Sequence, residues 1–64
     1  MKHVDSYSDG MCGWVLMESG GRQVKVHWSV RGNVSGQGQA MDVGRSVLRG
    51  ETVAKDQMRF VTIL

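Results

Sequence analysis

The fold of this chain is decided by the stretch Gln23-Val24-Lys25-Val26-His27-Trp28-Ser29-Val30-Arg31. Apolar residues occupy every second position from Val24 to Val30, and polar residues occupy the positions between them. A period of two fits a β-strand that is buried on one side and exposed on the other. We therefore predict a strand over residues 23–31, with its polar side facing solvent.

The segment before this strand forms the other half of a predicted β-hairpin. Residues 12–18 are a compact apolar run, and the glycines of Ser19-Gly20-Gly21-Arg22 supply the positive φ angles that a tight reversal needs. Alternation divides the run into Cys12, Trp14 and Leu16 on one side and Val15 and Met17 on the other. Because both tryptophans of the hairpin sit among apolar residues, we expect them to point inward.

The segment 58–64 is predicted to be a further strand, since it is rich in β-branched and aromatic residues and apolar on both sides. Two strands of this kind indicate a sheet covered on both faces. A chain of 64 residues has too little material to cover both, so we expect the second face to meet another copy or a partner. The residues predicted to form this interface are Val15, Met17, Val61 and Ile63.

The segment from Ala40 to Gly50 allows two interpretations. As a helix, it would gather its apolar residues on one face and end at Gly50 as a cap. As strands, Val47 and Leu48 would pair with Thr52 and Val53. A glycine at position 44 costs a helix about 1 kcal/mol, and the valines favour strands. We favour strands.

These elements predict a single all-β domain over residues 1–64. The expected architecture is a small antiparallel sheet or barrel of about five strands, SH3-like, Sm-like or OB-like. The alternative is an α+β fold with one short helix around residues 40–49. A chain this short buries only about 60% of its unfolded surface, so its core is thin. The one cysteine, Cys12, cannot close an intrachain disulfide, so a homo-oligomer is the expected source of extra stability.

Several classes of function have no support in the sequence. The spacing of His3, Cys12 and His27 predicts no metal site, and no residues form a catalytic signature, so we expect no cofactor and no enzyme activity. Residues 5–10 resemble part of a calcium loop, but a turn held by Asx and Ser side chains fits them better. No apolar run is long enough for a secretory signal or a membrane span, so we expect a cytoplasmic protein.

The positive charge is concentrated in the middle of the chain. The formal net charge is +2, whereas residues 22–49 alone carry +4. Cationic side chains beside a polar loop could track the phosphates of RNA or DNA. The residues predicted to bind nucleic acid are Arg22, Lys25, His27, Arg31, Asn33, Arg45 and Arg49, with Tyr7 as the expected stacking platform. The alternative function is a protein-binding inhibitor or adaptor, of the kind found as phage or plasmid accessory proteins, acting through its apolar strands or by strand addition.

Overall fold

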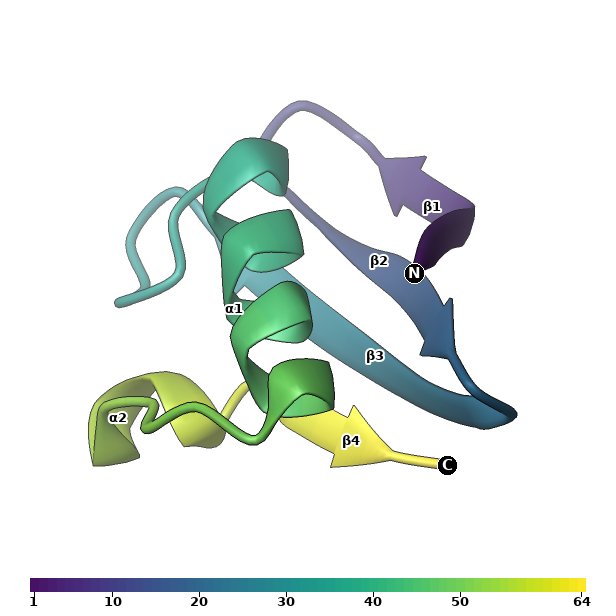
Figure 1. Ribbon diagram of the computed structural model, residues 1–64. Helices are drawn as coiled ribbons and strands as arrows, with labels where there is room; N and C mark the ends of the chain where they lie inside the picture. The colour runs from purple at the N-terminus through teal and green to yellow at the C-terminus, as the bar shows by residue number, and fades with distance from the viewer.

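A four-stranded antiparallel sheet carries one long helix across one of its faces. The computed structural model describes residues 1–64 and contains, in chain order, β1 (Lys2–Ser8), β2 (Cys12–Ser19), β3 (Arg22–Ser29), α1 (Gln37–Arg49), the one-turn α2 (Lys55–Met58) and β4 (Val61–Ile63). The strands lie in the order β1-β2-β3-β4, and α1 packs on β2 and β3 (Figure 1). Neither helix is long and apolar enough to cross a membrane.

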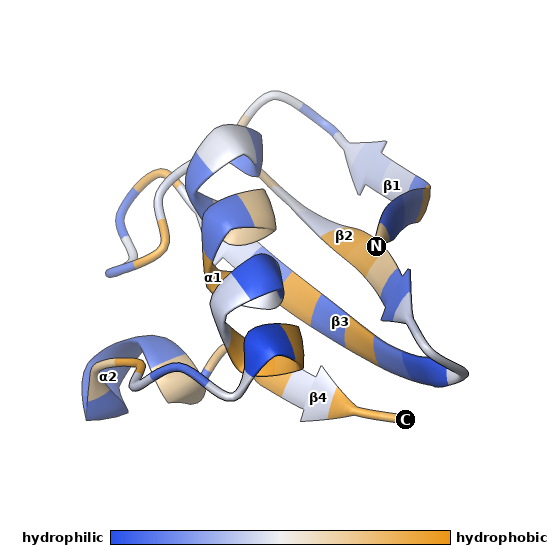
Figure 2. Ribbon diagram, viewed as in Figure 1, coloured by the Kyte–Doolittle hydropathy of each residue, from blue (hydrophilic) through white to orange (hydrophobic).

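The central hairpin of β2 and β3 confirms the prediction from the alternating stretch. Its turn is formed by Gly20 and Gly21, whose φ angles are 58° and 80°. Two successive positive φ angles match a two-residue turn whose twist agrees with that of the flanking strands. The turn fixes the register, so that Val15 faces Val26 across the hairpin. Apolar and polar residues alternate along β3, as the orange and blue bands in Figure 2 show.

The core lies between the hairpin and α1. Five strand residues point toward the helix, namely Val15, Met17, Val24, Val26 and Trp28, and all five are buried. Ala40, Val43 and Leu48 meet them from α1, and Val34 closes one end from the loop before the helix. The predicted division of β2 and β3 into two sides is therefore confirmed. A single apolar layer between one helix and one sheet is the whole core.

The prediction of strands over residues 40–50 is wrong, and the helical alternative is confirmed. The glycine that counted against a helix is what lets α1 approach the sheet, because a Cβ on Gly44 would stand only 3.0 Å from the Cγ of Met17. Close packing offsets the weak helix propensity of glycine. The helix ends at Gly50, which has a φ of 76° and donates its N–H to the carbonyl oxygens of Ser46 and Val47.

The prediction of a small antiparallel sheet is confirmed, but the expected number of five strands and the closure into a barrel are wrong. With residues 40–49 helical, no strand remains to pair Val47 and Leu48 with Thr52 and Val53, and the sheet stays open at β1 and β4. The predicted alternative, an α+β fold with one helix around residues 40–49, describes the architecture, although α1 begins earlier, at Gln37. The last strand is also shorter than predicted, because Met58 belongs to α2.

The first strand was not predicted at all. The sequence predicts a turn over residues 5–10, but residues 5–8 belong to β1, which pairs with β2. Only the end of this segment forms the expected Asx turn, in which Asp9 Oδ1 accepts the N–H groups of Met11 and Cys12, both at 2.9 Å. β1 lacks an apolar alternation because it lies beyond the edge of α1, so almost all of its side chains are exposed.

Candidate functional site

The sheet has a second face, opposite α1, which no helix covers. We call the side chains of β1, β2 and β3 on this side the open face: Lys2, Asp5, Tyr7, Trp14, Leu16, Glu18, Gln23, Lys25 and His27. On β2 and β3 they alternate with the buried residues of the same strand. Trp14 and Leu16 are therefore half-buried by their neighbours on the sheet and remain accessible from outside.

One row of the open face consists of three ring side chains. The strand register places Tyr7 opposite Trp14 and Trp14 opposite His27, so that the rings lie side by side on three neighbouring strands. Directly opposed residues have Cβ atoms about 4.5–5.5 Å apart. Tyr7 is 51% exposed and His27 is also exposed. The row is therefore an aromatic strip that runs across the strands.

A positive charge lies beside this strip. The Lys25 Nζ is 4.1 Å from the centroid of the Trp14 ring. A lysine ammonium over an indole ring is a cation–π contact, of about 0.5–1 kcal/mol at an exposed site. The contact keeps the charge of Lys25 next to the ring, whereas a free lysine side chain would extend into solvent. The strip thus combines stacking surface with a positioned cation.

The other end of the open face is polar and internally paired. Lys2, Glu18 and Gln23 form a row across the three strands. Gln23 Nε2 donates to Glu18 Oε1 at 3.1 Å, and Lys2 Nζ lies 3.6 Å from Glu18 Oε2. These groups satisfy one another, so this end offers few free donors or acceptors. The aromatic end is the part of the face that is available for recognition.

The structure brings together only two of the seven residues predicted to bind nucleic acid. Lys25 and His27 share the open face with the aromatic row. Arg22 stands at the hairpin turn, and Arg31 and Asn33 lie in the exposed loop after β3, which ends at Ser29 and not at residue 31. Arg45 and Arg49 are exposed on α1, on the other side of the sheet, and Arg45 forms an ion pair with Asp42. The predicted set is therefore split between two sides of the molecule.

The residues predicted to face a partner are also divided. Val15 and Met17 lie in the core under α1, at 0% and 3% exposure, so they are not available to a partner. Val15 and Met17 are apolar because they pack against α1, and the residues of α1 were predicted to form strands. Val61 is half-buried beside this core, and Ile63 is exposed at the end of β4.

Trp14 is the functional candidate that the sequence analysis missed. It was expected to point inward, but only Trp28 does so. The signal was available in the turn, because a reversal at Gly20 and Gly21 places Trp14 opposite His27. Since His27 belongs to the polar side of its strand, Trp14 has to lie on that side as well.

Cys12 takes part in the turn between β1 and β2. Its Sγ lies 3.5 Å from Asp9 Oδ2, and the hydrogen bond to this carboxylate raises the pKa of the thiol. The N–H groups of Cys12 and Met11 lower the pKa of Asp9 in turn. A thiol with a raised pKa is a weaker nucleophile at neutral pH. The pair holds the turn, and nothing in its setting activates the sulfur.

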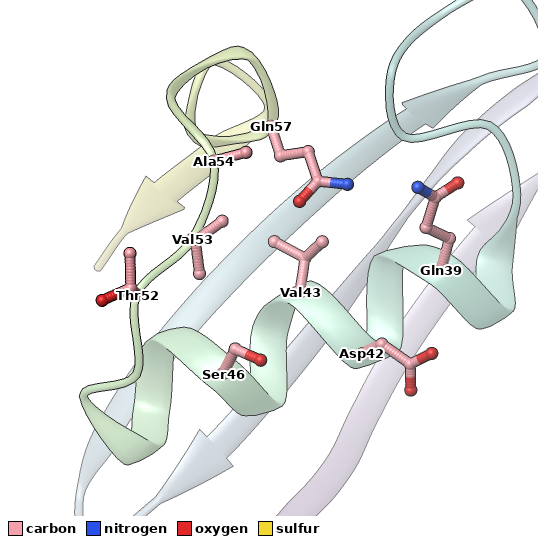
Figure 3. A pocket seen from close by; sticks show the side chains of 8 residues that line it. All are labelled: Gln39, Asp42, Val43, Ser46, Thr52, Val53, Ala54 and Gln57. Carbon is pink, nitrogen blue, oxygen red and sulfur yellow. The ribbon is translucent and has the colours of Figure 1, made fainter.

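A pocket of about 180 Å³ lies between α1 and the segment that leads into α2 (Figure 3). The side chain of Gln39 at one end is already committed, because its Oε1 accepts from Ser35 and its Nε2 donates to the carbonyl oxygen of Asn33. Asp42 is paired with Arg45. The pocket offers only a few uncommitted polar groups, so it ranks below the open face as a recognition site.

Comparison of the chain with protein-family models, with curated proteins and with solved structures finds no match. The open face is therefore the basis on which a function is proposed.

Proposed function

We propose that the protein binds single-stranded nucleic acid on the aromatic end of its open face. The observation that carries the proposal is the row formed by Tyr7, Trp14 and His27, with Lys25 held over the Trp14 ring. Unpaired bases stack on exposed aromatic side chains, and every base has a flat surface for this contact. The ammonium of Lys25 lies close enough to the strip to pair with a phosphate of the same strand.

The geometry favours a single strand over a duplex. A duplex presents phosphates and groove edges, which a protruding helix or two-stranded ribbon enters, whereas its bases are already stacked on one another. The aromatic row is broad and lies within a sheet, so it fits splayed bases. Arg31 and Asn33 are exposed in the loop that follows β3, the strand that carries His27. RNA and DNA both satisfy this chemistry.

The proposal is tested by titrating a fluorescently labelled single-stranded oligonucleotide of mixed sequence with the protein at several salt concentrations. Binding should weaken as salt rises, and Lys25→Gln should reduce the slope of log K against log salt by about 0.7, the contribution of one phosphate contact on a single strand. An undetectable change in anisotropy at low salt would refute the proposal. So would a slope that is the same for wild type and Lys25→Gln.

The chain offers a matched control for this experiment. Arg49→Gln also removes one positive charge, but from the exposed surface of α1, on the opposite side of the sheet. If the open face is the site, this variant should retain the wild-type salt slope. A loss equal to that of Lys25→Gln would indicate diffuse attraction to the whole molecule.

A protein partner on the same face is the second candidate. Asp5 and Glu18 share the face with Lys2 and Lys25, so its formal charges balance, and Leu16 lies at its centre. A nearly neutral face with an apolar centre resembles the core of a protein interface. Binding of this kind depends on Leu16 and changes little with salt, whereas nucleic-acid binding changes strongly.

A further inference from the structure

The outer strand β4 is bonded to the sheet on one side only. His27 donates its N–H to the carbonyl oxygen of Phe60 at 2.8 Å, and Leu64 donates its N–H to the carbonyl oxygen of Gln23 at 3.0 Å. These two bonds lie at opposite ends of β4. In an antiparallel pair, residues that bond to the neighbour alternate with residues that do not. The two bonds therefore fix which residues of β4 are directed toward β3.

This alternation leaves the backbone of two residues pointing away from the sheet. Thr62 is paired with Lys25 and lies between the two bonded positions, so its backbone groups also face β3. Val61 and Ile63 direct their N–H and C=O groups outward, where no other strand of the molecule lies. The edge thus presents two donors and two acceptors at regular spacing.

The side chains at this edge are apolar and exposed to solvent. Ile63 is 63% exposed and Leu64 is 65% exposed. The run from Phe60 to Leu64 contains no charge and no proline, and β4 pairs with β3 without a bulge. Charges, prolines, bulges and a very short strand are devices that keep an edge strand from pairing with another chain. β4 lacks the first three, and the bonds at Phe60 and Leu64 extend its pairing with β3 beyond its own three residues.

The opposite edge of the sheet has a bulge and a charged side chain. The pairing of β1 with β2 is shifted by a bulge between His3 and Asp5. Asp5 Oδ1 accepts the N–H of Ser6 at 2.8 Å, so this N–H already has a partner within its own strand. The carboxylate of Asp5 also opposes the approach of an identical strand. The contrast between the two edges points to β4 as the one that pairs with another strand.

We propose that two copies of the chain associate through their β4 strands to form a continuous eight-stranded sheet. In the antiparallel register centred on Thr62, Val61 of each copy stands opposite Ile63 of the other. The outward N–H and C=O groups of these residues then bond across the junction. The exposed Ile63 side chain gains an apolar neighbour on the side of the sheet that carries α1.

A second copy fits this edge because a two-fold interface brings each residue close to its own counterpart. A charged edge would repel its copy, whereas Phe60 to Leu64 is uncharged and alternates apolar side chains on both sides of the strand. The two-fold axis runs perpendicular to the sheet at Thr62. Both copies of α1 therefore lie on one side, and both open faces lie on the other. The dimer does not require the proposed function, since the open face is not part of the junction.

The proposal is tested by size-exclusion chromatography with light scattering over a range of protein concentrations. The wild type should approach twice the chain mass of 7.1 kDa as concentration rises. Ile63→Pro removes only an outward N–H, so it should leave the β3–β4 pairing intact and yield a monomer at every concentration. Ile63→Lys changes an already exposed position and should also yield a monomer, because it places like charges from both copies near the two-fold axis. Circular dichroism shows whether each variant is folded.

The control is Ser6→Pro, which makes the same kind of change on the outer side of β1 and should leave the dimer unaffected. A wild-type monomer at all concentrations would overturn the proposal. A dimer that survives in a folded Ile63→Pro or Ile63→Lys variant would also overturn it, because the junction would then lie elsewhere. Open-ended oligomers abolished by Ser6→Pro would mean that β4 pairs with β1, and they would reject the two-fold junction as well.

Discussion

Replacing Trp14 by alanine removes the centre of the aromatic row, and its effect can be worked out from the structure. The ring is half-buried among its neighbours, and Lys25 already occupies part of its surface at 4.1 Å, so at most one base stacks on it. One base stacked on an aromatic side chain contributes about 1–3 kcal/mol. Since 1.4 kcal/mol is a tenfold change, Trp14→Ala should weaken binding by about 5- to 150-fold.

The assay is the anisotropy titration at fixed low salt, with two companion variants. Trp14→Phe keeps an aromatic surface and should keep most of the affinity. Trp14→Leu keeps apolar volume without a ring, so it should lose nearly as much as alanine. Trp28→Phe provides a separate readout, because Trp14 is then the sole tryptophan, and its fluorescence should change when a base stacks on it.

The substitution also has a cost for the fold, which has to be measured separately. Loss of the contact with Lys25 should lower the free energy of unfolding by about 0.5–1 kcal/mol. Loss of the half-buried ring surface adds to this, and urea denaturation measures the sum. The reasoning is refuted if folded Trp14→Ala binds the oligonucleotide as tightly as the wild type. It is also refuted if the leucine variant matches the phenylalanine variant, because apolar volume would then explain the effect without stacking.

Further predictions concern the turns and the sheet. Gly13→Ala should lower the free energy of unfolding by at least about 3 kcal/mol, because the new Cβ would overlap the backbone oxygen of Tyr7, which cannot move aside as a side chain can. Urea denaturation measures this loss. Gly20→Ala should cost about 1–2 kcal/mol in the same assay, since its φ is 58°. The pKa of Asp9 is lowered in the folded protein, so the Asp9 carboxylate contributes stability at pH values above its ordinary pKa of 3.8. This stability is lost as the pH falls through the lowered pKa. Asp9→Asn should therefore flatten the acid limb of a curve of unfolding free energy against pH. The same substitution should speed the reaction of Cys12 with a thiol reagent near pH 8, because the carboxylate raises the pKa of that thiol.

The parts of the fold that could be predicted are those set by local pattern. The alternation of residues 23–31 and the pair Gly20–Gly21 suffice for the hairpin, because side-chain period and turn type both act over a few residues. The same two signals fix the register. The register places Trp14 opposite His27, on the polar side of the hairpin. The prediction that both tryptophans point inward is incompatible with this register.

The parts that were mispredicted depend on contacts between distant segments. Gly44 weakens a helix considered alone, but it stabilises this one by letting α1 approach Met17. That contact joins residues far apart in sequence, so no local pattern reports it. β1 has almost no buried side chain, so its sequence shows no alternation that would predict a strand. It forms a strand because its backbone pairs with β2. Both errors contributed to the choice of an all-β fold of about five strands over a four-stranded sheet that carries one helix.

The two proposals together predict how affinity depends on the length of the nucleic acid. In the β4-paired dimer, the two Trp14 rings lie on the same side of one sheet and are separated by five strand spacings, about 24 Å before twist is counted. A strand long enough to reach both rows should bind more tightly than a short one, because its second contact is intramolecular. Ile63→Pro should abolish this advantage of length while leaving the affinity for a short oligonucleotide unchanged. If long and short oligonucleotides bind a dimeric wild type equally well, the two open faces do not act on one strand, and the dimer serves stability alone.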